Sequence, residues 1–152
     1  MTSYAIKAKK TVNGKAPSGN EAGKFTFKLY KIDDKGNETL VDTKSNGDGG
    51  LVSFDTFGNI TEAGTYWYKI TEEGTVAGYT IDTTVYYAEV VVNATPSNGV
   101  IISKNAKVTY HKGTKTGDTA TVATFNNIKK EDETSANIKV CLLYTSDAAD
   151  DL

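Results

Sequence analysis

GTYWYKITE, residues 64–72, alternates apolar and polar side chains with the two-residue period of a half-buried β-strand. Tyr66, Tyr68 and Ile70 share the face that a core would cover, and Glu72 falls on that same face. A carboxyl group buried among apolar side chains is costly unless a partner satisfies it. The stretch therefore predicts a strand that carries a buried acid.

Two distant segments place other polar side chains in the same way. Lys10 is in phase with the apolar positions of residues 4–12, and Asn127 is in phase with those of residues 119–127. An amine, a carboxyl and a carboxamide can satisfy one another in a core. Because a desolvated amine is a nucleophile, it can also attack the carbon of a neighbouring amide. The three positions form a candidate reactive cluster.

Each of the three residues also has an ordinary interpretation. Lys10 can be an edge-strand lysine that reaches water, Glu72 a strand-end carboxylate, and Asn127 a turn residue beside Asn126. Lys9 and Asn126 are the neighbouring alternatives for a reactive pair. Both fall on the opposite faces of their strands, so the alternation favours Lys10 and Asn127.

Strands are predicted along the whole chain, and no window of helical length shows a 3.6-residue period. They are expected near residues 4–12, 24–32, 38–43, 51–54, 65–72, 85–93, 99–109 and 119–127. Turn signals such as Asn13-Gly14 and Pro96-Ser97-Asn98-Gly99 separate them. Short strands at even spacing in a chain of 152 residues predict a single all-β domain, a β-sandwich.

Composition narrows the classes of function. The net charge is −2 with acidic and basic residues interleaved, so no basic face suggests nucleic acid, and no apolar run is long enough to span a membrane. The single Cys, Cys141, cannot form an internal disulfide. The single His, His111, is expected in a loop rich in Lys, Gly and Thr, so neither a His-based metal site nor a catalytic triad is predicted. No cofactor is expected.

The last residues depart from the style of the rest. Residues 141–152 resemble the translation of a transposon-end sequencing adapter, and we expect this tail to be non-native; a short acidic tail is the alternative. Residues 134–140 echo residues 2–8, with four identities in seven positions. We therefore expect residues 1–130 to form one domain, and residues 131–140 to contain a linker and the start of a second copy in a tandem array.

Several motifs in their order resemble a known family, the streptococcal-type pilin isopeptide-linkage domain. They are Lys10-Thr11-Val12-Asn13-Gly14, Gly23-Lys24-Phe25-Thr26-Phe27-Lys28-Leu29, the quoted strand 64–72, Gly78-Tyr79-Thr80-Ile81-Asp82 and Ala123-Thr124-Phe125-Asn126-Asn127. The resemblance covers about residues 4–128. The one departure is at the end, where Ile128 and Lys129 replace the family's usual closing aromatic residue.

The resemblance implies an Ig-like domain of Gram-positive surface pili and fibrillar adhesins. Such domains cross-link their first strand to their last by a spontaneous Lys–Asn bond that a Glu assists. Carried over by motif, Lys10 is the nucleophile, Asn127 the electrophile and Glu72 the catalyst, which are the residues that the alternation isolates. Burial should keep both Lys10 and Glu72 neutral, and Glu72 is expected to hydrogen-bond the Asn127 carbonyl oxygen. One turnover per molecule is expected, not an enzyme.

The favoured function is a shaft module in a secreted, wall-attached pilus or adhesin at the cell surface. Its expected partners are neighbouring copies of the domain, other pilin subunits or host surface ligands. The alternative is a binding module of the same sandwich class that holds carbohydrate or a host protein. Trp67, which alternation places on the outer face, could stack on a sugar, although a cross-strand partner is the commoner role.

Overall fold

The computed structural model describes residues 2–54, 57–60, 62–97 and 100–130. Nearly all of its regular structure is β. The strands are β1 (Thr2–Tyr4), β2 (Lys7–Val12), β3 (Thr26–Ile32), β4 (Glu38–Ser45), β5 (Leu51–Ser53), β6 (Phe57–Ile60), β7 (Gly64–Glu73), β8 (Tyr79–Thr80), β9 (Tyr86–Ser97), β10 (Val100–Lys112), β11 (Thr119–Ala120) and β12 (Ala123–Lys129). Two single 3₁₀ turns, η1 (Gly19–Glu21) and η2 (Asp48–Gly50), lie in the connections.

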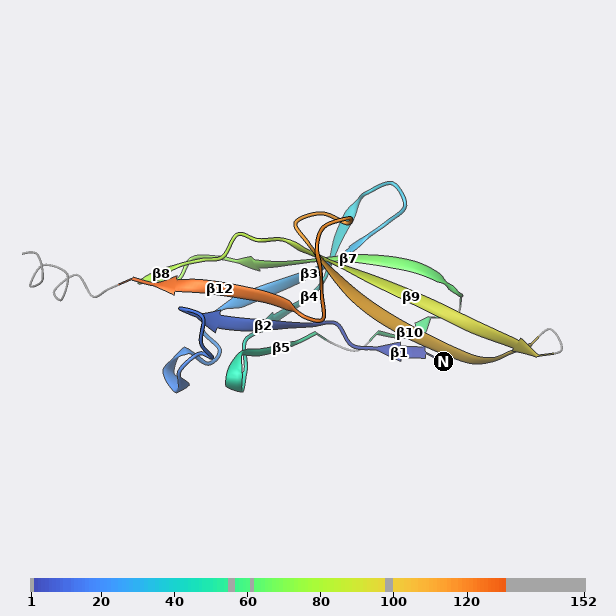
Figure 1. The fold of residues 1–152 in the computed structure, drawn as a ribbon, viewed down its shortest axis with the longest axis horizontal. Coiled ribbons are helices and arrows are strands. Elements are labelled where there is room, and N and C mark those ends of the chain that lie inside the picture. Colours follow the sequence, from blue (N-terminus) through green and yellow to red (C-terminus); the bar gives the residue numbers. More distant parts are fainter. Residues whose placement is uncertain (1, 55–56, 61, 98–99, 131–152) are drawn as a thin grey trace, which may run out of the picture.

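Two sheets form the sandwich that the strand pattern predicts. One sheet has the order β11-β10-β9-β7-β3-β4, and the other has the order β5-β2-β12-β8. A separate ribbon pairs β1 with β6. The long axis of the molecule follows these strands, and the β9–β10 hairpin extends along it toward the end that carries the N-terminus (Figure 1).

The core lies between the sheets and contains the apolar positions of the alternating strands. On β7, Tyr68 and Ile70 are buried, as the stretch 64–72 predicts. The other wholly buried apolar side chains on named strands include Ala8, Phe27, Leu29, Val52, Ala88, Val90, Ala123 and Phe125. They come from both sheets, so packing the two faces together is what orders the strands.

The first and last strands of the sandwich lie side by side, as expected. β12 pairs with β2 in parallel, with Phe125 opposite Lys10 and Asn127 opposite Val12. Every other strand pair in the described residues is antiparallel. Both strands run away from the end that carries the N-terminus, so β12 finishes at the opposite end of the molecule (Figure 1).

The structure differs from the predicted strands in a few places. The strand expected at residues 4–12 is divided, because β1 pairs with β6 whereas β2 joins β5 and β12. The expectation that His111 lies in a loop was wrong: it belongs to β10, opposite Thr119 of β11. The short strands β6 and β8 were not predicted, because Gly58-Asn59 in β6 is typical of a turn and β8 has only two residues.

The expected linker and second copy (131–140) and the expected tail (141–152) lie outside the described residues. Within the described residues, no helix has the length and apolarity needed to cross a membrane.

Candidate cross-linking site

Strand pairing and sheet packing bring the three predicted residues together. Lys10 lies on β2 and Asn127 on the adjacent strand β12, while Glu72 faces them from β7 in the other sheet. Lys10 and Asn127 have no exposed surface, and Glu72 is 7% exposed. The alternation therefore gave the correct face for all three. The Lys10 and Glu72 side chains are buried and do not face water, and Asn127 lies within β12 and not in a turn.

The Glu72 carboxyl bridges the other two side chains. Its Oε1 lies 3.0 Å from Lys10 Nζ, and its Oε2 accepts a hydrogen bond of 2.5 Å from Asn127 Nδ2. Lys10 Nζ also donates to the backbone carbonyl of Phe125 at 3.3 Å. One carboxyl group thus contacts both the nitrogen that would attack and the nitrogen that would leave.

The orientation of the Asn127 amide differs from the expectation. Its Oδ1 accepts a hydrogen bond of 2.8 Å from the backbone N–H of Asp82. A backbone N–H can only donate, so the oxygen must face Asp82 and the nitrogen must face Glu72. Glu72 therefore contacts the amide nitrogen and not the carbonyl oxygen. Asp82 was quoted within a family motif, but alternation gives no signal for a residue that acts through its backbone.

Burial drives both ionisable members of the cluster toward their neutral forms. It lowers the pKa of Lys10, although the hydrogen bond to Glu72 opposes this shift. It raises the pKa of Glu72, although the hydrogen bonds from Asn127 and Lys10 oppose that shift. The surroundings are apolar, with Lys10 Nζ 4.9 Å from the centroid of the Phe25 ring. An uncharged amine and an uncharged carboxylic acid are the forms that amide transfer requires.

The neighbouring alternatives lie elsewhere. Lys9 is exposed. Asn126 is half-buried, and its Oδ1 accepts hydrogen bonds from Thr11 Oγ1 at 2.8 Å and from the Gly14 N–H at 2.7 Å. Asn126 thus fastens the turn after β2 to β12, and neither residue contacts Glu72 in the described structure.

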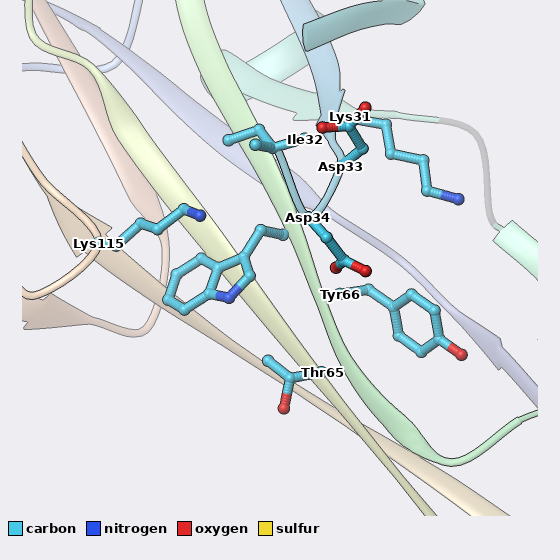
Figure 2. A pocket seen from close by; sticks show the side chains of 8 residues that line it. Lys31, Ile32, Asp33, Asp34, Thr65, Tyr66 and Lys115 are labelled. Carbon is cyan, nitrogen blue, oxygen red and sulfur yellow. The ribbon is translucent and has the colours of Figure 1, made fainter. Parts of the chain in front are cut away.

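A surface pocket surrounds Trp67, the residue considered for carbohydrate binding. Its volume is about 470 Å³, and it is lined by Lys31, Ile32, Asp33, Asp34, Thr65, Tyr66, Trp67 and Lys115. Figure 2 shows Lys115 on one side of the pocket, with Asp34 and Tyr66 on the other. Lys115 Nζ lies 5.0 Å from the indole centroid, and the His111 ring lies 5.6 Å from it. Trp67 therefore already packs against its own chain.

One family model matches most of the chain. The model of the FctA family, the Spy0128-like isopeptide containing domain, matches residues 6–130. The comparison with curated proteins found no match.

Two crystal structures of the major pilin of Streptococcus pyogenes resemble the chain. An asparagine-to-alanine mutant is 20% identical with a TM-score of 0.52, and the pilin itself is 18% identical with a TM-score of 0.50. Each alignment covers 84% of this chain and 50% of the pilin, so the chain spans about half the length of the pilins it matches. At these identities the likeness concerns the fold.

Proposed function

The chain belongs to the family of Spy0128-like isopeptide containing domains, and from this premise we propose that it is a shaft module of a wall-attached surface pilus or adhesin, stabilised by an isopeptide bond between Lys10 and Asn127. One observation carries the proposal: the buried Glu72 carboxyl contacts both the Lys10 amine and the Asn127 amide nitrogen. A pilus structural module is what the family and the similar pilin folds support. The bond and the attachment to a cell wall are the proposed part.

The geometry supports a direct amide transfer. The neutral Lys10 amine attacks Cγ of Asn127, and Nδ2 leaves as ammonia. The two oxygens of Glu72 relay the proton, since Oε1 faces the attacking nitrogen and Oε2 faces the departing one. The folded core holds the groups in place, and such proximity contributes roughly 7–11 kcal/mol in well-aligned intramolecular reactions. The reaction happens once in each molecule, so the domain modifies itself and does not turn over as an enzyme does.

The arrangement of the strands supports a role under tension. β2 and β12 are parallel neighbours; the chain enters β2 from the side of the N-terminus, and β12 finishes at the opposite end of the molecule (Figure 1). A pull on the two ends of the domain therefore shears one strand past the other. A bond from Lys10 to Asn127 would carry that force directly between the strands. Neighbouring copies joined end to end through residues 131–140 would then form a continuous shaft.

Intact-mass measurement tests the bond. Residues 1–140 should weigh one ammonia less than the sequence, and Lys10→Ala or Asn127→Ala should restore the full mass. Lys9→Ala and Asn126→Ala are the matched controls and should still lose ammonia, because these residues do not contact Glu72. A full-mass wild-type protein would refute the proposal.

A further inference from the structure

Asp82 contacts β12 through two separate parts of itself, its backbone N–H and its carboxylate. Its backbone N–H donates to Asn127 Oδ1 at 2.8 Å, as described above. Its carboxylate Oδ2 accepts the backbone N–H of Asn126, the residue directly before Asn127, also at 2.8 Å. Asp82, in the segment between β8 and β9, thus hydrogen-bonds both the main chain of Asn126 and the side chain of Asn127 on β12.

The other carboxylate oxygen of Asp82 orders its own segment. Oδ1 accepts the backbone N–H of Thr84 at 2.8 Å. On the other side of Asp82, Thr80 of β8 pairs with Ile128 of β12. The Asp82 N–H is therefore fixed relative to β12 by contacts before and after it in the chain, and none of them involves Lys10 or Glu72.

Asp82 stays ionised in this setting. Burial alone would raise the pKa of its carboxyl, but the hydrogen bonds from Thr84 and Asn126 outweigh burial and the pKa is lowered. An ionised carboxylate has acceptor capacity at both oxygens, which the two N–H donors require. An asparagine in its place would offer one oxygen and would turn an amide N–H₂ toward one of the donors.

We propose that Asp82 is the oxyanion donor and positioning residue of the cross-linking reaction. Its backbone N–H orients the Asn127 amide so that the nitrogen faces Glu72, and stabilises the charge that develops on Asn127 Oδ1. Its carboxylate holds that N–H in place by accepting the backbone N–H of Asn126 on β12. This inference rests on the proposed Lys10–Asn127 bond. An amide transfer also needs a hydrogen-bond donor aimed at the carbonyl oxygen. Lys10, Glu72 and Asn127 do not supply this donor, and Asp82 does.

The step balances as follows. The lone pair of Lys10 Nζ forms a bond to Asn127 Cγ, and the carbonyl electron pair moves onto Oδ1, which faces the Asp82 N–H. When this pair returns, the Cγ–Nδ2 bond breaks. Nδ2 leaves as ammonia with a proton delivered by Glu72, and Glu72 regains a proton from Nζ. The hydrogen bond from Asp82 persists in the product, now to the isopeptide carbonyl.

Nuclear magnetic resonance tests the hydrogen bond directly. A scalar coupling across the hydrogen bond should join the backbone ¹⁵N of Asp82 to ¹³Cγ of residue 127 in the wild-type chain. It should be observed whether or not ammonia has been lost, so its outcome is separate from that of the mass measurement. Asn127→Ala supplies the control without the acceptor. A folded wild-type protein whose Asp82 amide couples to another carbonyl, or to none, would overturn the inference.

The rate of ammonia loss tests the positioning role. Chains made in a cell-free system and quenched at intervals in denaturant give the time course by intact mass. Asp82→Asn should slow the reaction at least tenfold, since removing one oxyanion donor costs roughly 10²–10³ in rate and a misplaced donor costs part of that. A wild-type rate for Asp82→Asn would refute the role, and the coupling decides the matter if this variant does not fold.

A matched control separates this effect from the loss of a turn-forming aspartate. Asp33 also accepts backbone hydrogen bonds through its carboxylate, from Lys35 at 2.9 Å and Asn37 at 2.8 Å. It follows the end of β3 remote from Phe27, the residue that pairs with Glu72. The Asp33→Asn variant should therefore lose ammonia at the wild-type rate.

Discussion

In the proposed amide transfer, Glu72 would carry more of the chemistry than any other single side chain, because it contacts both nitrogens involved. Glu72→Gln keeps the shape and a hydrogen bond to each neighbour but cannot relay a proton. We expect intact-mass measurement of Glu72→Gln to give the full mass, with no ammonia lost over days. Circular dichroism should show that the variant is folded. Glu73→Gln is the matched control, since Glu73 pairs with Lys28 and Tyr30 at the surface. Normal loss of ammonia in Glu72→Gln would mean that proton relay by Glu72 is unnecessary.

The raised pKa of Glu72 also predicts how stability depends on pH once the bond is absent. In Lys10→Ala the acid remains buried, so its folded-state pKa lies above the unfolded value of about 4.5. The folded state then binds more protons than the unfolded state, and stability falls as the pH rises from that value toward the folded-state pKa. The thermal midpoint of Lys10→Ala should drop over this range.

The double variant Lys10→Ala/Glu72→Gln isolates that contribution, because every other titrating group is shared. Its midpoint should change less with pH than that of Lys10→Ala in the same range. Parallel curves for the two variants would show that Glu72 is ionised in the fold and that its burial does not favour the neutral acid.

At the scale of elements, η2 sets the position of β2 through a close approach at Gly50. A Cβ on Gly50 would lie 2.1 Å from the Lys10 carbonyl oxygen and 2.9 Å from Pro17 Cδ. Gly50 and Gly49 both have positive φ, of 88° and 70°, but a Cβ on Gly49 would meet nothing within 4 Å. Comparing alanine at the two positions separates backbone strain from displacement of the strand that carries the nucleophile.

We expect Gly49→Ala to cost about 1–2 kcal/mol of folding free energy, the usual penalty for a left-handed alanine, and to leave the rate of ammonia loss unchanged. Gly50→Ala should cost several kcal/mol, since β2 must shift, and should slow ammonia loss. Denaturant unfolding, in the Lys10→Ala background, and intact mass measure the two effects. Equal rates in the two variants would mean that the reaction tolerates movement of β2.

The predictability of these elements follows from the length of their alternation. β7 and β9 each alternate over seven residues, and β3 and β12 each alternate over five. β2 alternates from Lys7 to Lys10, so the faces that carry Lys10, Glu72 and Asn127 could all be read from the sequence. β8 has two residues and was invisible. The contribution of Asp82 was invisible for another reason: it depends on a backbone N–H whose direction is set by pairing with β12, which no local pattern encodes.

At the scale of the whole molecule, the bond would join nearly the two ends of the domain. It closes a loop of about 117 residues, for which the chain-entropy model gives a stabilisation of roughly 5 kcal/mol. Under force the effect is larger, because residues 11–126 lie outside the path of tension. Single-molecule stretching through handles at the two ends of the domain should give no unfolding step for the wild type and a full-length step for Glu72→Gln. Extension of the wild type by the interior loop would contradict the shaft role.

A bond between Lys10 and Asn127, on the neighbouring strands β2 and β12, would give the chain the topology of a ring with two tails that leave at these residues. A protease that cuts within the ring opens it without separating the tails. Lys35, exposed in the turn between β3 and β4, is such a point. After cleavage there, the wild-type protein should remain one covalent species on a denaturing gel, while Glu72→Gln falls into two fragments. In a filament of such domains, surface loops could be cut, or could diverge in sequence, without severing the thread.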